Sequence, residues 1–179
     1  YFYFFSCVGV MGATCVFLNS GLELASLADD DILHAVADVP SVISQVPIPK
    51  SVRQILCTGE AMTLSVVEHL MKTESRLSIR NNYGPTECSD GLTSKEYCGL
   101  GDFVRRPGSI GRPMSNVAIY IVHPDTLHLQ PIGSYGELLV GGIQVTSGYL
   151  NRPALTNEKF IANPWIRADP SGCGVLYRT

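Results

Sequence analysis

The 179-residue sequence lacks several features that define specialised classes of protein. It contains no run of lysine and arginine, and its formal net charge of −3 is close to neutral. Nucleic acid is therefore not an expected partner. No stretch is of low complexity, and a hydrophobic fraction of 45% with a charged fraction of 16% does not match a disordered chain. The composition indicates one globular domain or a portion of a larger one.

The six cysteines also lack a pattern. They form no C-x-x-C pair and no cluster with histidine at the spacing of a metal site. A disulfide scaffold is typical of smaller, loop-rich secreted chains. We therefore interpret them as free thiols in a reducing cytoplasm: Cys7, Cys15, Cys57, Cys88, Cys98 and Cys173.

The first 22 residues carry no charge and form a candidate membrane span. The segment is rich in aromatic and β-branched residues, is interrupted by Ser6, Gly9, Gly12 and Asn19, and has no basic flank. We therefore favour a buried strand and helix and expect no membrane partner. The absence of an initiator Met and the start inside an apolar segment predict a portion of a longer protein.

Strand and helix patterns alternate through the first half. Short apolar runs at residues 14–18, 52–57 and 77–81 predict buried strands. Residues 22–39 carry apolar side chains at close to a helical period, and Thr63 is a good N-cap for a second helix. Strands that alternate with helices indicate an α/β fold with a parallel sheet and flanking helices.

The second half changes character. Residues 117–122 and 136–142 predict strands, the second of them bounded by glycines. We place the junction near residue 105, so that residues 1–105 form an α/β part and residues 106–179 form a β-rich part.

The strongest local signal follows the strand predicted at residues 77–81. In an open α/β sheet, ligands lie beyond the carboxyl ends of the strands. Gly84 permits close backbone approach, and Tyr83 offers a flat face for a base. Thr86 offers a hydroxyl for phosphate, and Glu87 offers an oxygen ligand for Mg²⁺. The alternative is an ordinary Gly-Pro turn with an exposed glutamate.

Further motifs follow in order along the chain. Residues 57–61 (CTGEA) also lie between a predicted strand and a predicted helix. The strings NNYGPTE at 81–87, GELLVGG at 136–142, GYLNRP at 148–153 and YRT at 177–179 come next. Their order and spacing resemble the adenylation domains of nonribosomal peptide synthetases over residues 14–179.

The resemblance implies a fold and a reaction. The fold would be part of the large subdomain of an adenylate-forming enzyme, with a β-rich, barrel-like portion after the α/β core. Such domains activate an amino acid with Mg-ATP to form an aminoacyl adenylate and pyrophosphate. They then load the phosphopantetheine thiol of a carrier domain. The implied cofactors are ATP and Mg²⁺, and the implied partners are the carrier domain and neighbouring synthetase domains.

The resemblance also assigns roles to residues. Tyr83 would stack on adenine, Thr86 would contact the α-phosphate, and Glu87 would hold Mg²⁺. Thr86 and Glu87 would thus be catalytic. The implied nucleotide-binding residues are Gly59, Glu60, Ala61, Asn82, Tyr83, Gly84, Pro85 and Thr86. The implied substrate pocket comprises Leu56, Thr58, Asn82, Asp90 and Gly91, with Val16 or Phe17.

Several elements of this family are absent from the sequence. It contains no Ser/Thr/Gly-rich phosphate loop that ends in lysine, no Phe-Asp-x-x-Ser segment, and no small C-terminal subdomain with its catalytic lysine. Gln144 stands where the family prefers glycine, and Thr146 and Ser147 replace a usual Ala-Arg. We therefore expect an incomplete adenylation domain that is inactive by itself.

Two other functions remain open at this stage. The first is an acyl- or aryl-CoA ligase of the same superfamily, and the second is a non-catalytic remnant of the fold. Asp90 bears on substrate choice, since a carboxylate in a dry pocket is costly unless it is paired. It would favour a cationic or strongly hydrogen-bonding substrate side chain, unless Asp90 instead caps a turn and faces solvent.

Overall fold

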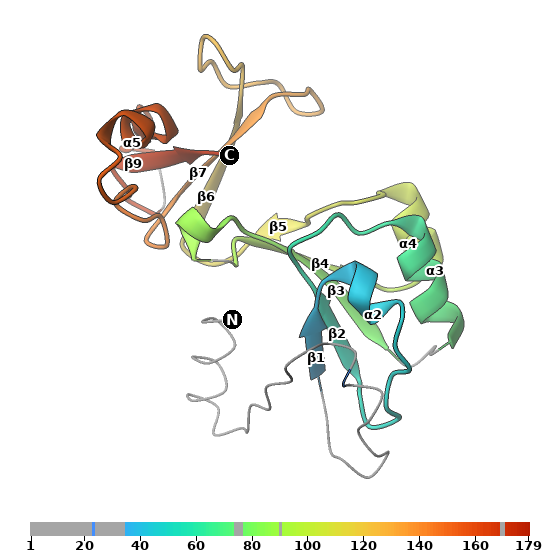
Figure 1. Ribbon diagram of the computed structural model, residues 1–179. Helices are drawn as coiled ribbons and strands as arrows, with labels where there is room; N and C mark the ends of the chain where they lie inside the picture. Colours follow the sequence, from blue (N-terminus) through green and yellow to red (C-terminus); the bar gives the residue numbers. More distant parts are fainter. Residues whose placement is uncertain (1–22, 24–34, 74–76, 90, 169–170) are drawn as a thin grey trace. The chain divides into compact units, whose positions relative to one another are not determined.

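The computed structural model describes residue 23 and residues 35–73, 77–89, 91–168 and 171–179 (Figure 1). These residues form two compact units. The first holds the described chain up to Gly84 together with Thr93–Arg112, and the second holds Pro85–Leu92 together with Pro113–Thr179. The motif at residues 81–87 is therefore divided between the two units.

The first unit is built on a five-stranded sheet whose strands follow in sequence order. The strands are β1 (Ala35–Asp38), β2 (Gln54–Cys57), β3 (Ser78–Tyr83), β4 (Thr93–Tyr97) and β5 (Arg112–Pro113). The first three are parallel, with Ile55 opposite Ile79, whereas β4 runs antiparallel to β3. The sheet is therefore mixed rather than wholly parallel.

Helices α2 (Pro40–Ile43), α3 (Leu64–Thr73) and α4 (Leu100–Arg105) belong to this unit, and Figure 1 shows α3 and α4 side by side. In α3 the carbonyl of Thr63 accepts the first helical hydrogen bond, from Val67 at 3.2 Å. Val67 and Leu70 are buried on one face, whereas Lys72 pairs with Glu68 on the exposed face. Burying side chains of this size contributes about 1.5–3 kcal/mol each.

The core of the first unit lies between α3, α4 and one face of the sheet. Ile55 and Ile79 are fully buried there, and the Tyr97 and Phe103 rings lie 5.1 Å apart. Side chains alternate between the two faces of a strand. The residues between the buried positions of β2 and β3 therefore point away from this core.

The second unit is an antiparallel sheet in the order β6-β7-β9-β8. Its elements are β6 (Val117–Val122), β7 (Glu137–Gly142), α5 (Pro153–Lys159), β8 (Phe160–Ala162) and β9 (Val175–Arg178), preceded by a 3-10 turn at Thr86–Cys88. Val122, Leu139 and Leu176 are completely buried in its core, against which Tyr120 and Trp165 pack as a stacked pair at 4.7 Å.

Most of the predicted elements are confirmed. The strands predicted at 52–57, 77–81 and 136–142 correspond to β2, β3 and β7, and the strand at 117–122 is β6. The helix predicted after Thr63 is α3. The α/β class with a β-rich second part is therefore correct. The strand predicted at 14–18 lies outside the described residues.

Two expectations need correction. The helical period over residues 22–39 is wrong at its end, because Ala35–Asp38 forms β1. Parallel pairing with β2 places Val36 beside Ile55 and satisfies backbone groups that a helix would satisfy locally, so tertiary pairing overrides a weak local pattern. The barrel-like expectation is also wrong for the described residues, where the second sheet is open between β6 and β8.

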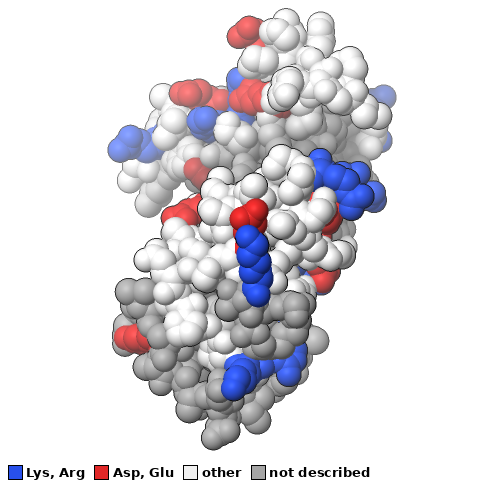
Figure 2. Space-filling model, turned by 90° about the vertical axis from the view of Figure 1, so that its right-hand side faces the viewer, with Lys and Arg blue, Asp and Glu red and all other residues white. Residues whose placement is uncertain are grey.

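Charge is distributed without a large patch of one sign on the face of the molecule in Figure 2, as far as its residues are described. Charged side chains of the first unit also pair with opposite charges, as Arg80 does with Glu96 at 3.1 Å and Lys95 with Asp102 at 2.5 Å. Within the described ranges, no helix has the length and hydropathy needed to cross a bilayer. The membrane-span candidate at residues 1–22 lies outside those ranges.

Candidate functional site

Two of the predicted motifs follow neighbouring parallel strands of the first unit. Residues 58–61 follow β2, and Gly84 follows β3, whose register pairs Cys57 with Asn81. Because parallel strands end at the same edge of a sheet, both motifs emerge at one edge. This edge is where open α/β sheets bind ligands.

The 58–61 turn is shaped by a glycine and a helix cap. Gly59 has φ +82°, a conformation that L-residues with side chains rarely adopt. The Glu60 carboxylate accepts a hydrogen bond from the Ser41 backbone N–H at 3.3 Å, at the start of α2. Glu60 therefore has a structural partner, and the backbone of Gly59, Glu60 and the exposed Ala61 is the part of the turn left for a ligand.

Leu56 and Asn82 point to the same face of the sheet. Ile55 and Asn81 are buried on the other face, and alternation along β2 and β3 turns their neighbours away from it. The register places Leu56 beside Arg80, two residues before Asn82 on that face. Thr58 follows on the chain and is half-buried. The structure therefore brings two residues of the predicted substrate pocket onto one face of the sheet.

Asn82 and Tyr83 point to opposite faces of β3. Alternation places the half-buried Tyr83 on the face of Asn81, whose amide donates to the Ser109 carbonyl at 3.1 Å. The buried Oδ1 of Asn82 has no hydrogen-bond partner among the described residues. A buried acceptor without a partner is costly, so Asn82 has the capacity to bind a donor.

The second unit holds the rest of the motif. Thr86 and Glu87 lie in the 3-10 turn that follows Pro85, with Thr86 exposed and Glu87 half-buried. Ser89 ends the turn in the left-handed conformation with φ 56°. Gly91 is buried. Asp90, Val16 and Phe17 lie outside the described residues.

Glu87 is tied to a segment much later in the chain. Its carboxylate accepts a hydrogen bond from the Tyr149 hydroxyl. Its backbone carbonyl accepts one from the Thr146 N–H at 2.8 Å. The Ser89 hydroxyl donates to the Gln144 carbonyl at 3.3 Å. The segment that departs from the family pattern thus holds the Glu87 turn through its backbone.

The surroundings of Glu87 favour its charged form. The hydrogen bond from Tyr149 is the largest cause that holds the pKa of the Glu87 carboxyl below its usual 4.5, and Tyr177 and Lys159 act in the same direction. Partial burial acts in the opposite direction and is outweighed. The Phe160 ring contacts both tyrosines, at 5.5 Å from Tyr149 and 5.2 Å from Tyr177. The Glu87 carboxylate is therefore ionised at neutral pH and lies beside a cluster of aromatic side chains.

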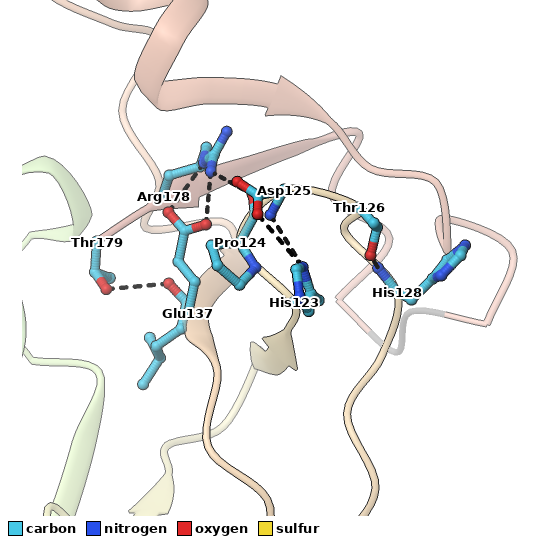
Figure 3. A network of polar contacts seen from close by, with 9 residues as sticks. His123, Pro124, Asp125, Thr126, His128, Glu137, Arg178 and Thr179 are labelled. Atoms are coloured by element: carbon cyan, nitrogen blue, oxygen red, sulfur yellow. Dashed lines mark hydrogen bonds and ion pairs between the residues drawn. The ribbon is translucent and has the colours of Figure 1, made fainter.

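Two other motifs meet in an ion pair (Figure 3). Arg178 of β9 donates to both carboxylate oxygens of Glu137 in β7, at 2.6 and 3.0 Å. The same guanidinium donates to the Pro124 carbonyl at 3.1 Å, and Thr179 donates to the Leu138 carbonyl at 3.1 Å. Glu137 raises the pKa of Arg178 above its usual value. The pair joins two strands of the sheet and is a structural feature.

The turn that supplies the Pro124 carbonyl is closed by local hydrogen bonds (Figure 3). The His123 N–H donates to the His128 carbonyl at 2.9 Å, and the Asp125 N–H donates to His123 Nδ1 at 3.3 Å. Leu127 takes the left-handed conformation with φ 56°. Within the described part of the chain, neither this turn nor any other cluster gathers three His, Cys, Asp or Glu side chains around a metal position.

Sequence reasoning missed the partners of Glu87. Tyr149 and Tyr177 both lie in motif strings, GYLNRP and YRT, which was the available signal. No local sequence pattern relates Glu87 to tyrosines so far along the chain, so only the tertiary structure of the second unit brings them together.

Comparison with known proteins identifies the family. The model of the family described as "AMP-binding enzyme" matches residues 4–150. The chain belongs to the AMP-binding enzyme family.

Individual relatives lie among peptide synthetases. The chain is 35% identical to tyrocidine synthase 3 of Brevibacillus parabrevis over 165 residues, which are 86% of the chain and 2% of that protein. It is 35% identical to gramicidin S synthase 2 of Aneurinibacillus migulanus over 78% of the chain and 3% of that protein. It is 39% identical to tyrocidine synthase 1 of Brevibacillus parabrevis over 72% of the chain and 11% of that protein. The chain spans a small fraction of these relatives.

Solved structures support the same fold. An artificially fused adenylation-PCP di-domain from Klebsiella oxytoca, NpsA-ThdA, aligns with a TM-score of 0.75 at 21% identity, over 93% of this chain and 31% of that one. The NpsA N-terminal subdomain in complex with 3-hydroxyanthranilyl-AMSN aligns with a TM-score of 0.74 at 21% identity, over 93% and 43% of the two chains.

Proposed function

We propose that this chain is part of an adenylation domain that activates an amino acid with Mg-ATP and loads it onto the phosphopantetheine thiol of a carrier domain. Family membership and synthetase relatives support the class. The observation that carries the proposal is the parallel pairing of β2 and β3. It brings residues 58–61 and the start of the 82–87 motif to one sheet edge.

Glu87 fits the role of a Mg²⁺ ligand. Its carboxylate is charged, and the Tyr149 hydroxyl occupies Oε1. Mg²⁺ is usually held by one or two carboxylates together with substrate phosphates. A single carboxylate is therefore enough, and the described part of the chain has no group of three His, Cys, Asp or Glu side chains that could hold a metal ion. Bound there, the ion would neutralise charge on the phosphates.

Side chains and backbone groups of the two motifs provide the proposed contacts with ATP. We propose that the half-buried Tyr83 ring stacks on adenine and that the exposed Thr86 hydroxyl donates to the α-phosphate. The remaining proposed contacts come mainly from backbone groups, at Gly59, Glu60, Ala61, Asn82, Gly84 and Pro85.

The proposed substrate wall combines observed and inferred positions. Leu56 and Asn82 share one sheet face, and Asn82 has an unpartnered buried acceptor among the described residues. By motif alone, we also propose Thr58, Asp90 and Gly91 as substrate-binding residues. We also propose that the protein works in the reducing cytoplasm, which the free Cys57 and Cys88 thiols support.

ATP–pyrophosphate exchange tests this function. In the intact protein that carries this sequence, we expect exchange with amino acids and thioester formation on its carrier domain. Glu87→Gln should lower exchange and raise the Mg²⁺ requirement, while Glu158→Gln, an exposed carboxylate on α5, should not. Activation of only acyl or aryl acids would instead identify a CoA ligase. Unchanged Mg²⁺ dependence in Glu87→Gln would remove Glu87 from the site.

A further inference from the structure

Tyr149 is held more firmly than a surface tyrosine. Its backbone N–H donates to the Thr156 hydroxyl at 2.9 Å, and the Thr156 N–H donates to the Arg152 carbonyl at 2.9 Å at the start of α5. Its ring packs edge-on against Phe160. The chain enters this residue through Gly148, where a Cβ would lie 2.4 Å from the Thr156 side chain. Backbone and ring of Tyr149 are therefore fixed independently of its hydroxyl.

The hydroxyl of this fixed ring is directed at one atom, Oε1 of Glu87. A carboxylate has two oxygens with about four acceptor positions, so an ordered donor on one oxygen orients the other. The turn that carries Glu87 is itself clamped by Thr146. Both ends of the Tyr149–Glu87 contact are thus held by backbone hydrogen bonds.

We propose that Tyr149 is a positioning residue for Glu87: its hydroxyl engages Oε1 and leaves Oε2 as the oxygen that meets the cation. This inference rests on the proposed function, in which Glu87 binds Mg²⁺. Hydrogen-bond partners of metal-binding carboxylates fix the orientation of the ligand, and their loss typically weakens metal binding on the order of tenfold or more.

Other groups around Glu87 act on its carboxylate less strongly than Tyr149 does. Tyr177 of β9 also hydrogen-bonds the carboxylate and Lys159 of α5 acts on its charge, but Tyr149 contributes most. Tyr177 is buried beside Phe160, whereas Cys88 points into the interior next to Glu87. Removal of the Tyr149 hydroxyl alone should therefore loosen the carboxylate without removing its charge or its aromatic surround.

The test is Tyr149→Phe in the intact protein, because this change removes only the hydroxyl. Manganese binding in the presence of ATP, followed by electron paramagnetic resonance, reports on the cation without catalysis. Exchange assays then give the Mg²⁺ concentration for half-saturation. In Tyr149→Phe we expect the manganese dissociation constant and this Mg²⁺ concentration each to rise by about tenfold. The urea midpoint of unfolding should stay unchanged. Glu87→Asp, which keeps the charge but shortens the reach to Tyr149, should shift the same way.

Two control variants distinguish the positioning role of the Tyr149 hydroxyl from the packing of its ring. Tyr135→Phe removes the hydroxyl of a tyrosine that is 99% exposed and should change nothing. Phe160→Leu disturbs the ring packing while keeping the hydroxyl and should lower stability more than metal binding.

The outcomes distinguish this inference from the proposed function. If Glu87→Gln weakens metal binding but Tyr149→Phe behaves as wild type, the positioning role is wrong. The same holds if Tyr149→Phe unfolds, because the contact is then structural. If Glu87→Gln itself leaves metal binding unchanged, the proposed metal role of Glu87 fails first.

Discussion

The Glu87 carboxylate and the Tyr149 hydroxyl share a hydrogen bond although 62 residues separate them in the sequence. The Glu87 carbonyl also accepts from Thr146, so the contact joins whole segments rather than two side chains. The motif that ends at Glu87 and the GYLNRP motif at 148–153 therefore contact each other in the folded chain. Their contact holds the ionised Glu87 carboxylate in a defined orientation at the surface of the second unit.

Gly111 should not tolerate a side chain. It has φ +82°, and a Cβ there would lie 2.0 Å from the Ser94 carbonyl oxygen. Gly111→Ala should therefore cost at least about 2 kcal/mol in the free energy of unfolding, measured by urea denaturation. Gly101→Ala is the matched control. Gly101 lies within α4, where an added Cβ would meet no atom within 4 Å, so alanine there should stabilise by about 0.5–1 kcal/mol. Equal effects would contradict the prediction.

Cysteine reactivity should follow burial. Burial is the main cause that raises the pKa of Cys57 and of Cys88 to about 12, with smaller contributions from Asp38 and Glu87. Cys98 is exposed. Because the thiolate is the reactive form, iodoacetamide at about pH 8 should label Cys98 in the native protein and leave Cys57 and Cys88 unlabelled. Peptide mass spectrometry measures each site, and labelling in guanidinium is the control. Equal labelling rates in the native state would refute the prediction.

Acid should weaken the first unit through Asp102. The hydrogen bond from Lys95, at 2.5 Å, is the main cause that holds the pKa of Asp102 below its usual 3.8. A carboxyl with a lowered folded pKa stabilises the fold above its unfolded pKa, and this contribution is lost as pH falls through the folded value. Asp102→Asn should therefore lower stability at neutral pH and flatten its decline below pH 3.8. Urea midpoints across this range measure both effects, and parallel curves for the two proteins would contradict the assignment.

Asp90 should influence substrate choice. An unpaired carboxylate in a dry pocket costs several kcal/mol, so a substrate with a cationic or hydrogen-bonding side chain would offset it. In the intact protein we expect such amino acids to be preferred, and Asp90→Ala to reduce that preference by about tenfold or more. Exchange assays with an amino-acid panel measure it, with Asp125→Ala in the exposed turn as control. A preference for leucine or valine that Asp90→Ala leaves unchanged would show that Asp90 lies outside the pocket.

Local patterns were enough to predict several elements. The apolar run at 117–122 became β6, and the period after Thr63 became α3, since both depend on neighbours within a few residues. The same reasoning failed at Ala35–Asp38, where pairing with β2 outweighs a loose helical period. It also could not show that the sheet formed by the described strands β6 to β9 is open, because closure depends on which edge strands meet.

The sequence by itself determined the order of the motifs, the α/β class and the residue types that could hold a nucleotide and a cation. These are properties of short segments, and composition and spacing record them. Tertiary structure alone decided that Leu56 and Asn82 share a sheet face while Tyr83 lies on the other. It alone decided that Glu87 meets Tyr149 and that Glu137 meets Arg178. Such contacts depend on strand register and packing between distant segments, for which a chain has no local periodicity.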